Sequence, residues 1–130
     1  MKLIVGGAFQ GKRAAAQRIT GIPLSEFLDG ALCPMEAIEQ GKAMYHFQEY
    51  LRRMMQEKLS TEGFVEALFL KNPDIVLVST ELGYGIVPMD PFEREYRERV
   101  GRICCEAAER STEVYRVVAG IPTKIKGEET

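Results

Sequence analysis

The chain has 130 residues, of which 45% are hydrophobic and 28% are charged, enough for one ordinary domain with a modest core. The net charge is only −2 with acids and bases intermixed, so neither nucleic acid nor a membrane surface is an expected partner. The three cysteines lack metal-site spacing, and no apolar run reaches membrane-spanning length. We therefore expect a single cytoplasmic domain over residues 1–130, with small-molecule or protein partners.

The first expected element is a short strand over residues 3–5, which ends at a glycine pair. The alanine-rich run KRAAAQRI after it has high helix propensity and predicts a helix. A weaker pattern favours a short strand at residues 26–28. Apolar residues then recur every three or four positions over residues 35–59, which predicts one long amphipathic helix, and a short helix is expected at residues 61–70.

The second half of the chain contains the most regular strand, the continuous apolar run of residues 75–78, which is typical of a parallel strand buried on both faces. A loop rich in glycine and proline leads to a helix that begins near Pro91. A last strand, EVYRVVAGI, precedes the polar tail PTKIKGEET. Strands separated by helices indicate an α/β fold with a small, mostly parallel sheet of three or four strands and flanking helices, as in P-loop NTPases.

A glycine-rich loop between the first strand and the first helix has the spacing of a phosphate-binding loop, Gly6-x-x-x-x-Gly11-Lys12. Glycines allow backbone N–H groups to converge on phosphate oxygens, and the helix N-terminus and Lys12 add positive charge. We call residues 6–13 the phosphate loop and expect a nucleotide, GTP or ATP, to bind there. The expected nucleotide-binding residues are Gly6, Gly7, Ala8, Phe9, Gln10, Gly11, Lys12 and Arg13.

Arg13 stands where the full motif has a serine or threonine whose hydroxyl binds Mg²⁺. A guanidinium has no acceptor atom for a cation, which puts magnesium-assisted phosphoryl transfer in question. Arg13 either binds phosphate itself or points to solvent while other oxygens and water hold the metal. A glycine turn that serves only packing is the remaining interpretation.

Two carboxylates are candidates for binding Mg²⁺ or substrate. Glu81 ends the most regular strand, and it would meet Lys12 at the carboxyl edge of the sheet if their strands are neighbours. The alternative for Glu81 is a carboxylate that braces a loop or caps a helix. Asp29 would follow the weak second strand and hold Mg²⁺ through water, but Asp-Gly is also an ordinary turn dipeptide.

The single histidine, His46, falls within the expected long helix. On a helix it would share one face with Lys42, Glu49, Tyr50 and Arg53, opposite the methionines. A nucleophilic or acid–base histidine needs an orienting carboxylate, so guanylyl transfer through His46 is chemically feasible. The alternative is a solvated helix face with ordinary charge pairs, and the methionine stripe fits a core or a subunit interface.

Two further pairs in the second half have open interpretations. Gly83 and Gly85 either supply positive φ angles for a tight substrate loop or simply connect elements. Cys104 and Cys105 are expected to pack as small buried hydrophobic residues.

The stretch from VLVSTELGYGIVP to AGIPTKIK contains a strand with a glycine-rich loop, a helix with Gly-Arg, and a final Gly-Ile-Pro-x-Lys-x-Lys. In this it resembles the bifunctional adenosylcobinamide kinase and adenosylcobinamide-phosphate guanylyltransferase family of cobalamin biosynthesis. The phosphate loop, IVGGAFQGKR, is similar to that family's Val-Thr-Gly-Gly-x-x-Ser-Gly-Lys-Ser. The agreeing residues of the second block are Glu81, Gly83, Gly85, Ile86, Val87, Pro88, Gly101, Arg102, Gly120, Ile121, Lys124 and Lys126.

The resemblance implies phosphorylation of the cobinamide hydroxyl by ATP or GTP and then GMP transfer from GTP, with a corrinoid partner and a homo-oligomer, a trimer. With it, Lys12 and Glu81 are expected catalytic residues, Asp29 and Glu81 the expected Mg²⁺ ligands, and Arg102 a substrate residue. His46 is an expected catalytic residue on its own chemistry, because the family's histidine motif does not align with it.

Three departures leave other functions open. Arg13 replaces the loop hydroxyl, Cys104-Cys105 replaces Asn-Gln, and the His-x-x-Arg-Arg-Pro-x-x-Trp segment with the guanylyl-accepting histidine is missing. A non-catalytic nucleotide- or corrinoid-binding paralogue is one alternative. An enzyme that acts on another substrate through His46 is a second.

Overall fold

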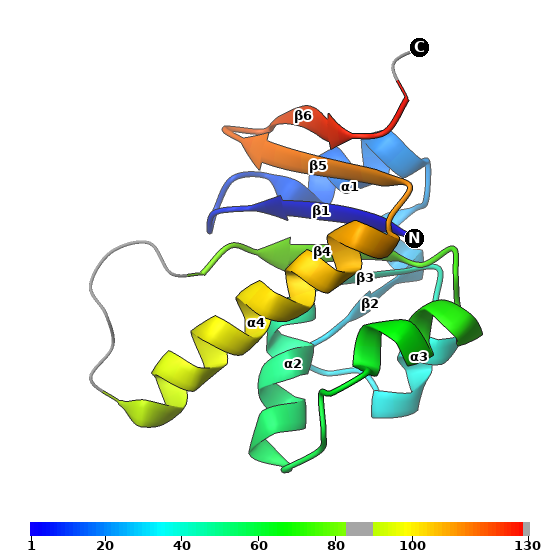
Figure 1. The fold of residues 1–130 in the computed structure, drawn as a ribbon. Helices are drawn as coiled ribbons and strands as arrows, with labels where there is room; N and C mark the ends of the chain where they lie inside the picture. The colour runs from blue at the N-terminus through cyan, green and yellow to red at the C-terminus, as the bar shows by residue number, and fades with distance from the viewer. Residues whose placement is uncertain (83–89, 129–130) are drawn as a thin grey trace.

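The computed structural model describes residues 1–82 and 90–128, which form a sheet with helices on both faces (Figure 1). The strands of the sheet lie in the order β2-β3-β4-β1-β5-β6. In chain order the elements are β1 (Lys2–Gly6), α1 (Lys12–Thr20), the 3-10 turn η1 (Leu24–Glu26), β2 (Phe27–Asp29), the 3-10 turn η2 (Met35–Glu39), β3 (Ala43–Tyr45), α2 (Phe47–Gln56), α3 (Phe64–Lys71), β4 (Val76–Thr80), α4 (Pro91–Arg110), β5 (Glu113–Val118) and β6 (Ile121–Lys126).

The sheet is parallel except at one edge. The central strand β1 pairs in parallel with β4 on one side and β5 on the other, and β2 and β3 continue the parallel pairing beyond β4. Only β6 runs antiparallel, paired with β5. The expected α/β fold with a mostly parallel, P-loop NTPase-like sheet is confirmed, and the carboxyl ends of five strands meet at one edge.

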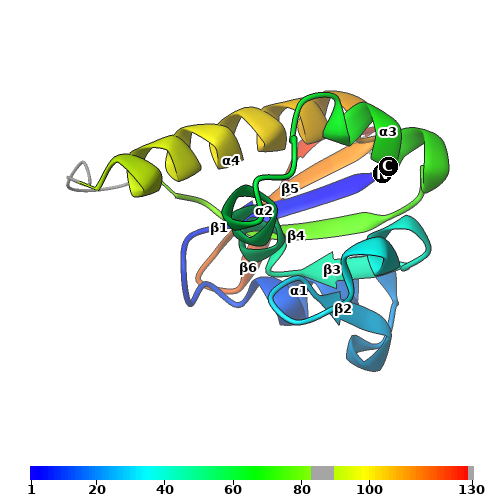
Figure 2. The same ribbon diagram turned by 90° about the horizontal axis from the view of Figure 1, so that it is seen from below.

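Two apolar layers cover the sheet (Figure 2). Helix α1 lies on one face, where Ala15 and Ala16 pack against Val76 and Val78 of β4. Helices α2, α3 and α4 cover the other face, where Leu77 belongs to the larger core cluster. Strand β4 is buried on both sides, as its continuous apolar run predicts. No helix in the two described ranges is long and apolar enough to cross a membrane.

The long helix expected over residues 35–59 is wrong. This segment forms η2, then β3, and only then α2. Ala43 and Met44 of β3 are fully buried, and the strand pairs with β2 on one side and β4 on the other. Hydrogen bonding along both edges of β3 outweighs the helix propensity of alanine and methionine. Apolar residues at helical spacing therefore fall partly in a strand and partly in α2.

The prediction of an unstructured polar tail after β5 is also wrong, because this segment forms the strand β6. An edge strand tolerates Pro122 and a row of lysines, since one of its sides makes no ladder. Lys126 Nζ donates to the carbonyl oxygens of Ala108 and Glu109 at 2.8 and 3.0 Å, at the negative end of the α4 dipole. The sheet therefore has six strands rather than three or four.

Candidate functional site

The phosphate loop connects β1 to α1 at the carboxyl edge of the sheet. Gly11 has a φ of 79°, and a Cβ there would lie 3.2 Å from Gly120 Cα. A Cβ on Gly6 would lie 2.6 Å from the carbonyl oxygen of Val117 in β5. Both positions therefore require glycine, one for its backbone angle and both for space. Phe9 also has a positive φ, 60°, which is uncommon for a bulky residue.

The turn between β5 and β6 supports the phosphate loop from the side. The N–H of Gly120 donates to the carbonyl oxygen of Gln10 at 2.7 Å, and the N–H of Ala119 donates to Gln10 Oε1 at 2.5 Å. Arg18 of α1 donates to the carbonyl oxygen of Gly120 at 2.9 Å. These bonds fix the path of the loop, a role for β6 that sequence reasoning missed.

Lys12 folds back over the loop that precedes it. Its Nζ donates to the carbonyl oxygen of Gly7 at 2.7 Å. Burial lowers the pKa of Lys12, and the Glu81 carboxylate opposes this shift. Since β1 and β4 are neighbours, Glu81 and Lys12 come together as predicted. Glu81 also donates its N–H to Gly6, at 2.8 Å, and accepts from Arg116 Nε at 3.0 Å.

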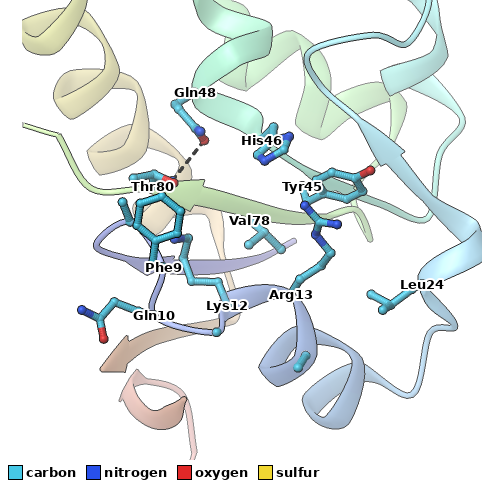
Figure 3. Close-up of a pocket in the computed structure, with 13 residues that line it drawn as sticks. Phe9, Gln10, Lys12, Arg13, Leu24, Tyr45, His46, Gln48, Val78 and Thr80 are labelled. Atoms are coloured by element: carbon cyan, nitrogen blue, oxygen red, sulfur yellow. Dashed lines mark hydrogen bonds between the residues drawn. The ribbon is translucent and has the colours of Figure 1, made fainter. Parts of the chain in front are cut away.

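Arg13 reaches from α1 toward the end of β3. Its guanidinium carbon lies 4.0 Å from the centroid of the Tyr45 ring, a cation–π contact. The Tyr45 ring in turn meets the His46 ring edge-on, with 4.7 Å between centroids. Arg13, Tyr45 and His46 thus form a row along one wall of the site (Figure 3).

His46 is not on a helix face. It is the N-cap of α2, directly after β3, with a φ of 57°. Its Nδ1 lies 3.0 Å from Asp29 Oδ1, at the end of the neighbouring strand β2. Burial raises the pKa of Asp29, but hydrogen bonds from the Ala31 N–H, His46 and Tyr45 outweigh it and hold the pKa below its usual value.

The helix face predicted around His46 is wrong, because His46 precedes α2; Glu49 is in the first turn of α2 and lies 3.7 Å from Arg52 Nε. Lys42 lies before β3 and pairs with Glu26, while Tyr50 is buried and donates to the carbonyl oxygen of Met35 at 2.7 Å. Arg53 donates to the carbonyl oxygen of Gly30 at 2.8 Å, in the turn after Asp29. Of the expected methionine stripe, Met44 and Met54 are in the core, as predicted.

A pocket of about 600 Å³ opens between the phosphate loop and the ends of β3 and β4 (Figure 3). It brings Lys12, Arg13 and His46 to one cavity. The lining also includes Tyr45 and Thr80. Among the described residues the lining is Ala8, Phe9, Gln10, Gly11, Lys12, Arg13, Ala14, Leu24, Tyr45, His46, Gln48, Val78 and Thr80.

No carboxylate belongs to the described lining of this pocket. Asp29 is engaged with His46 and the Ala31 N–H, and Glu81 with Arg116. Within the described part of the chain, no three histidine, cysteine, aspartate or glutamate side chains are grouped to hold a metal ion. The residues that line the pocket therefore do not fit the carboxylate ligands that Mg²⁺ usually takes, and magnesium at Asp29 and Glu81 stays a prediction.

The remaining predicted site residues lie elsewhere. Arg102 is exposed on α4, pairs with Glu98 at 2.9 Å and lines a separate polar pocket. Gly83 and Gly85 lie outside the described residues. Cys104 is half-buried, and burial raises its pKa to about 11, whereas Cys105 is exposed, so the prediction of two buried cysteines is wrong for Cys105.

Sequence reasoning missed Tyr45, Gln48 and Thr80 as pocket residues. Gln48 is buried at 7% exposure, its Oε1 accepts from the Thr80 N–H at 3.1 Å, and its carbonyl oxygen accepts from the Tyr96 hydroxyl at 2.7 Å. The bond from the Thr80 N–H links the end of β4 to the first turn of α2. The polar end of β4 was the one available signal, because Tyr45 and Gln48 fell within the supposed long helix.

Comparison with known protein families gives a match over residues 38–125 to CobU, described as cobinamide kinase / cobinamide phosphate guanyltransferase. The match covers more than half of the chain. The chain belongs to the CobU family. The matched residues include β3, β4, α4 and β5, and the phosphate loop lies before them, so its similarity to the family loop depends on its own residues.

Individual relatives of the CobU family match a shorter part. The bifunctional adenosylcobalamin biosynthesis protein CobP of Pseudomonas aeruginosa is 39% identical over 67 residues, which are 52% of this chain and 39% of that protein. The proteins named CobU of Escherichia coli and Salmonella typhimurium are each 44% identical over 52 residues, 40% of this chain and 29% of each relative. The matches thus span well under half of these curated relatives.

Proposed function

We propose that the chain binds the triphosphate of GTP at the phosphate loop and transfers its guanylyl group, through His46, to a cobinamide phosphate. The observation that carries the proposal is that His46, held by Asp29, lines the same pocket as Lys12 and Arg13. A covalent histidine intermediate needs an oriented ring next to a phosphate site, and the Asp29 contact of His46 and its place beside Lys12 and Arg13 support this role. Family membership supports the choice of guanylyl group and cobinamide.

The position of the proton on the His46 ring determines which ring nitrogen can act as the nucleophile. The carboxylate of Asp29 can only accept, so Nδ1 donates to it, and in the neutral ring Nε2 keeps its lone pair. Nε2 attacks the α-phosphorus, the bond to the bridging oxygen breaks, and pyrophosphate leaves. A phosphate oxygen of the cobinamide phosphate then attacks the same phosphorus and releases His46. Lys12 and Arg13 neutralise the pyrophosphate as it leaves.

The kinase activity in the family description has weaker support from these residues. Phosphoryl transfer to a hydroxyl in P-loop enzymes uses the hydroxyl after the loop lysine and an acidic residue to hold Mg²⁺. Arg13 has replaced that hydroxyl, and no carboxylate belongs to the described lining of the pocket. The guanylyl step depends less on a loop hydroxyl and a pocket carboxylate, because its nucleophile is His46.

A non-catalytic nucleotide-binding function is the second candidate. Lys12 is satisfied by the loop's own Gly7 carbonyl, which is compatible with a loop that binds without transferring. The missing His-x-x-Arg-Arg-Pro-x-x-Trp segment favours it too. The choice of GTP over ATP, a corrinoid partner, a homo-oligomer and a cytoplasmic location stay predictions.

Covalent labelling tests the proposal. The protein is incubated with GTP labelled at the α-phosphate, denatured and separated, with GTP labelled at the γ-phosphate as the control. We expect label on the protein only from the α-position, and none on His46→Ala. Failure of the wild type to take the label while it still binds GTP would overturn the transfer and favour the binding protein. Label that persists on His46→Ala would place the acceptor elsewhere.

A further inference from the structure

Arg13 is exposed at the start of α1, and its guanidinium is positioned by a contact with an aromatic ring. Its guanidinium stacks on Tyr45 at 4.0 Å, and the Tyr45 ring is itself held by its edge-on contact with His46. A stacked guanidinium keeps its N–H edges available for phosphate oxygens, and its planar fork suits bidentate binding. The position directly after Lys12 therefore presents donors to the pocket instead of a metal-binding oxygen.

The charges around the cavity point the same way. Two basic side chains, Lys12 and Arg13, are in its described lining, and the neutral Thr80 hydroxyl is among the few side-chain oxygens there. The two candidate carboxylates are outside that lining: Asp29 bonds to His46, and Glu81, whose charge acts on Lys12, pairs with Arg116. A divalent cation on the phosphates would therefore meet the Arg13 charge without acidic ligands in the described lining to offset the repulsion.

We infer that this pocket binds its nucleotide as the metal-free polyphosphate, with the Arg13 guanidinium in the place of Mg²⁺. The inference rests on the proposed nucleotide site and names the form of the ligand that it takes. Mg²⁺ cancels part of the negative charge of a triphosphate, which weakens its attraction to Lys12 and Arg13. The metal complex is thus the poorer ligand, the reverse of the order in P-loop enzymes whose loop hydroxyl and acidic residue hold Mg²⁺.

Calorimetric titration of the full chain tests this with two probes, GTP and inorganic pyrophosphate, each in EDTA and in excess Mg²⁺. We expect both to bind in EDTA, and GTP to bind no more tightly with Mg²⁺. Arg13→Ala is expected to weaken binding of pyrophosphate in EDTA about tenfold or more, the loss of charge-assisted hydrogen bonds. Arg94→Ala, which removes an exposed α4 arginine outside the pocket, is the matched control and should bind as the wild type does.

The outcomes separate this inference from the proposed function. GTP that binds more tightly with Mg²⁺ than in EDTA would overturn the inference and leave the nucleotide site intact. Unchanged affinity of Arg13→Ala in EDTA would also overturn it, because Arg13 would then not contact the phosphates. No binding of either probe under any condition would overturn both the inference and the proposed function.

Discussion

His46 Nδ1 lies 3.0 Å from Asp29 Oδ1, across the carboxyl ends of the neighbouring strands β3 and β2. The two residues are 17 positions apart in sequence and meet only because these strands pair. The contact places an oriented imidazole at the rim of the pocket that the phosphate loop forms. It is the relationship on which the proposed transfer chemistry depends.

Asp29→Asn is expected to lower the rate of label transfer from GTP by about 10²-fold. The amide keeps the shape and still accepts from the Ala31 N–H, but it no longer provides the carboxylate that fixes the His46 tautomer. The affinity for GTP should stay near that of the wild type, because Asp29 does not line the pocket. Single-turnover labelling and calorimetry measure the two quantities separately.

Glu26→Gln is the control for that change. Glu26 is exposed and pairs with Lys42 just before β2, so the variant removes a nearby carboxylate without touching His46. Labelling by Asp29→Asn at the rate of Glu26→Gln would show that Asp29 does not position the histidine.

Tyr45 is a positioning residue for Arg13. Tyr45→Leu removes the ring under the guanidinium and is expected to weaken pyrophosphate binding in EDTA by about two- to fivefold, the size of an exposed cation–π contact. Tyr45→Phe keeps the ring and should bind pyrophosphate as the wild type does. Equal affinities for the two variants would mean that the stack does not prepare Arg13 for phosphate.

Two glycines should respond in opposite directions to alanine. Gly6→Ala places a Cβ 2.6 Å from the carbonyl oxygen of Val117, so the free energy of unfolding should fall by about 1–3 kcal/mol. Gly101 is exposed in the middle of α4, with nothing within 4 Å of its added Cβ, and Gly101→Ala should raise it by about 0.5–1 kcal/mol. Urea unfolding measures both. A Gly6→Ala protein as stable as the wild type would contradict the close approach of loop and β5.

Tyr50 makes stability depend on alkaline pH. Burial raises the pKa of Tyr50 from 10.0 to about 12, so the folded protein keeps a proton that the unfolded chain loses. The free energy of unfolding should therefore fall between pH 10 and 12, where the unfolded chain releases this proton first. Tyr50→Phe should show a shallower fall over this range.

Tyr50→Phe also removes the hydrogen bond to the Met35 carbonyl, which should cost about 1 kcal/mol near neutral pH. Tyr96 has a pKa raised to about 12 by its burial and is present in both proteins, so the difference in slope reports on Tyr50. Identical pH slopes for wild type and variant would contradict the buried neutral phenol.

The sequence was sufficient for the elements with strong local signals. The run at residues 75–78 predicted β4, and Pro91 marked the start of α4, where the Asp90 side chain also accepts from the Phe92 N–H. Gly6, Gly11 and Lys12 predicted the loop between β1 and α1. In each case the local propensity and the tertiary role agree.

β3 and β6 were missed because they are stabilised by pairing with neighbouring strands and not by a local sequence pattern. β3 is three residues long, and Met44 fits a helical spacing as well as a strand between two partners. β6 is exposed along most of its length, so it has no apolar alternation to detect. The two missed strands also caused errors in the predicted site. Without β3, His46 was placed on a helix, and without β6, the contact of Gly120 with Gln10 was not predicted.

Calorimetric titration of GTP into the wild type and Lys12→Ala measures whether the phosphate loop binds the triphosphate. We expect saturable binding that Lys12→Ala weakens about tenfold or more, through loss of a charged phosphate contact. Lys42→Ala, which removes an exposed lysine outside the pocket, should leave the affinity unchanged. Binding of GTP that is equally tight in Lys12→Ala, or no binding by the folded wild type, would contradict a triphosphate site at the phosphate loop.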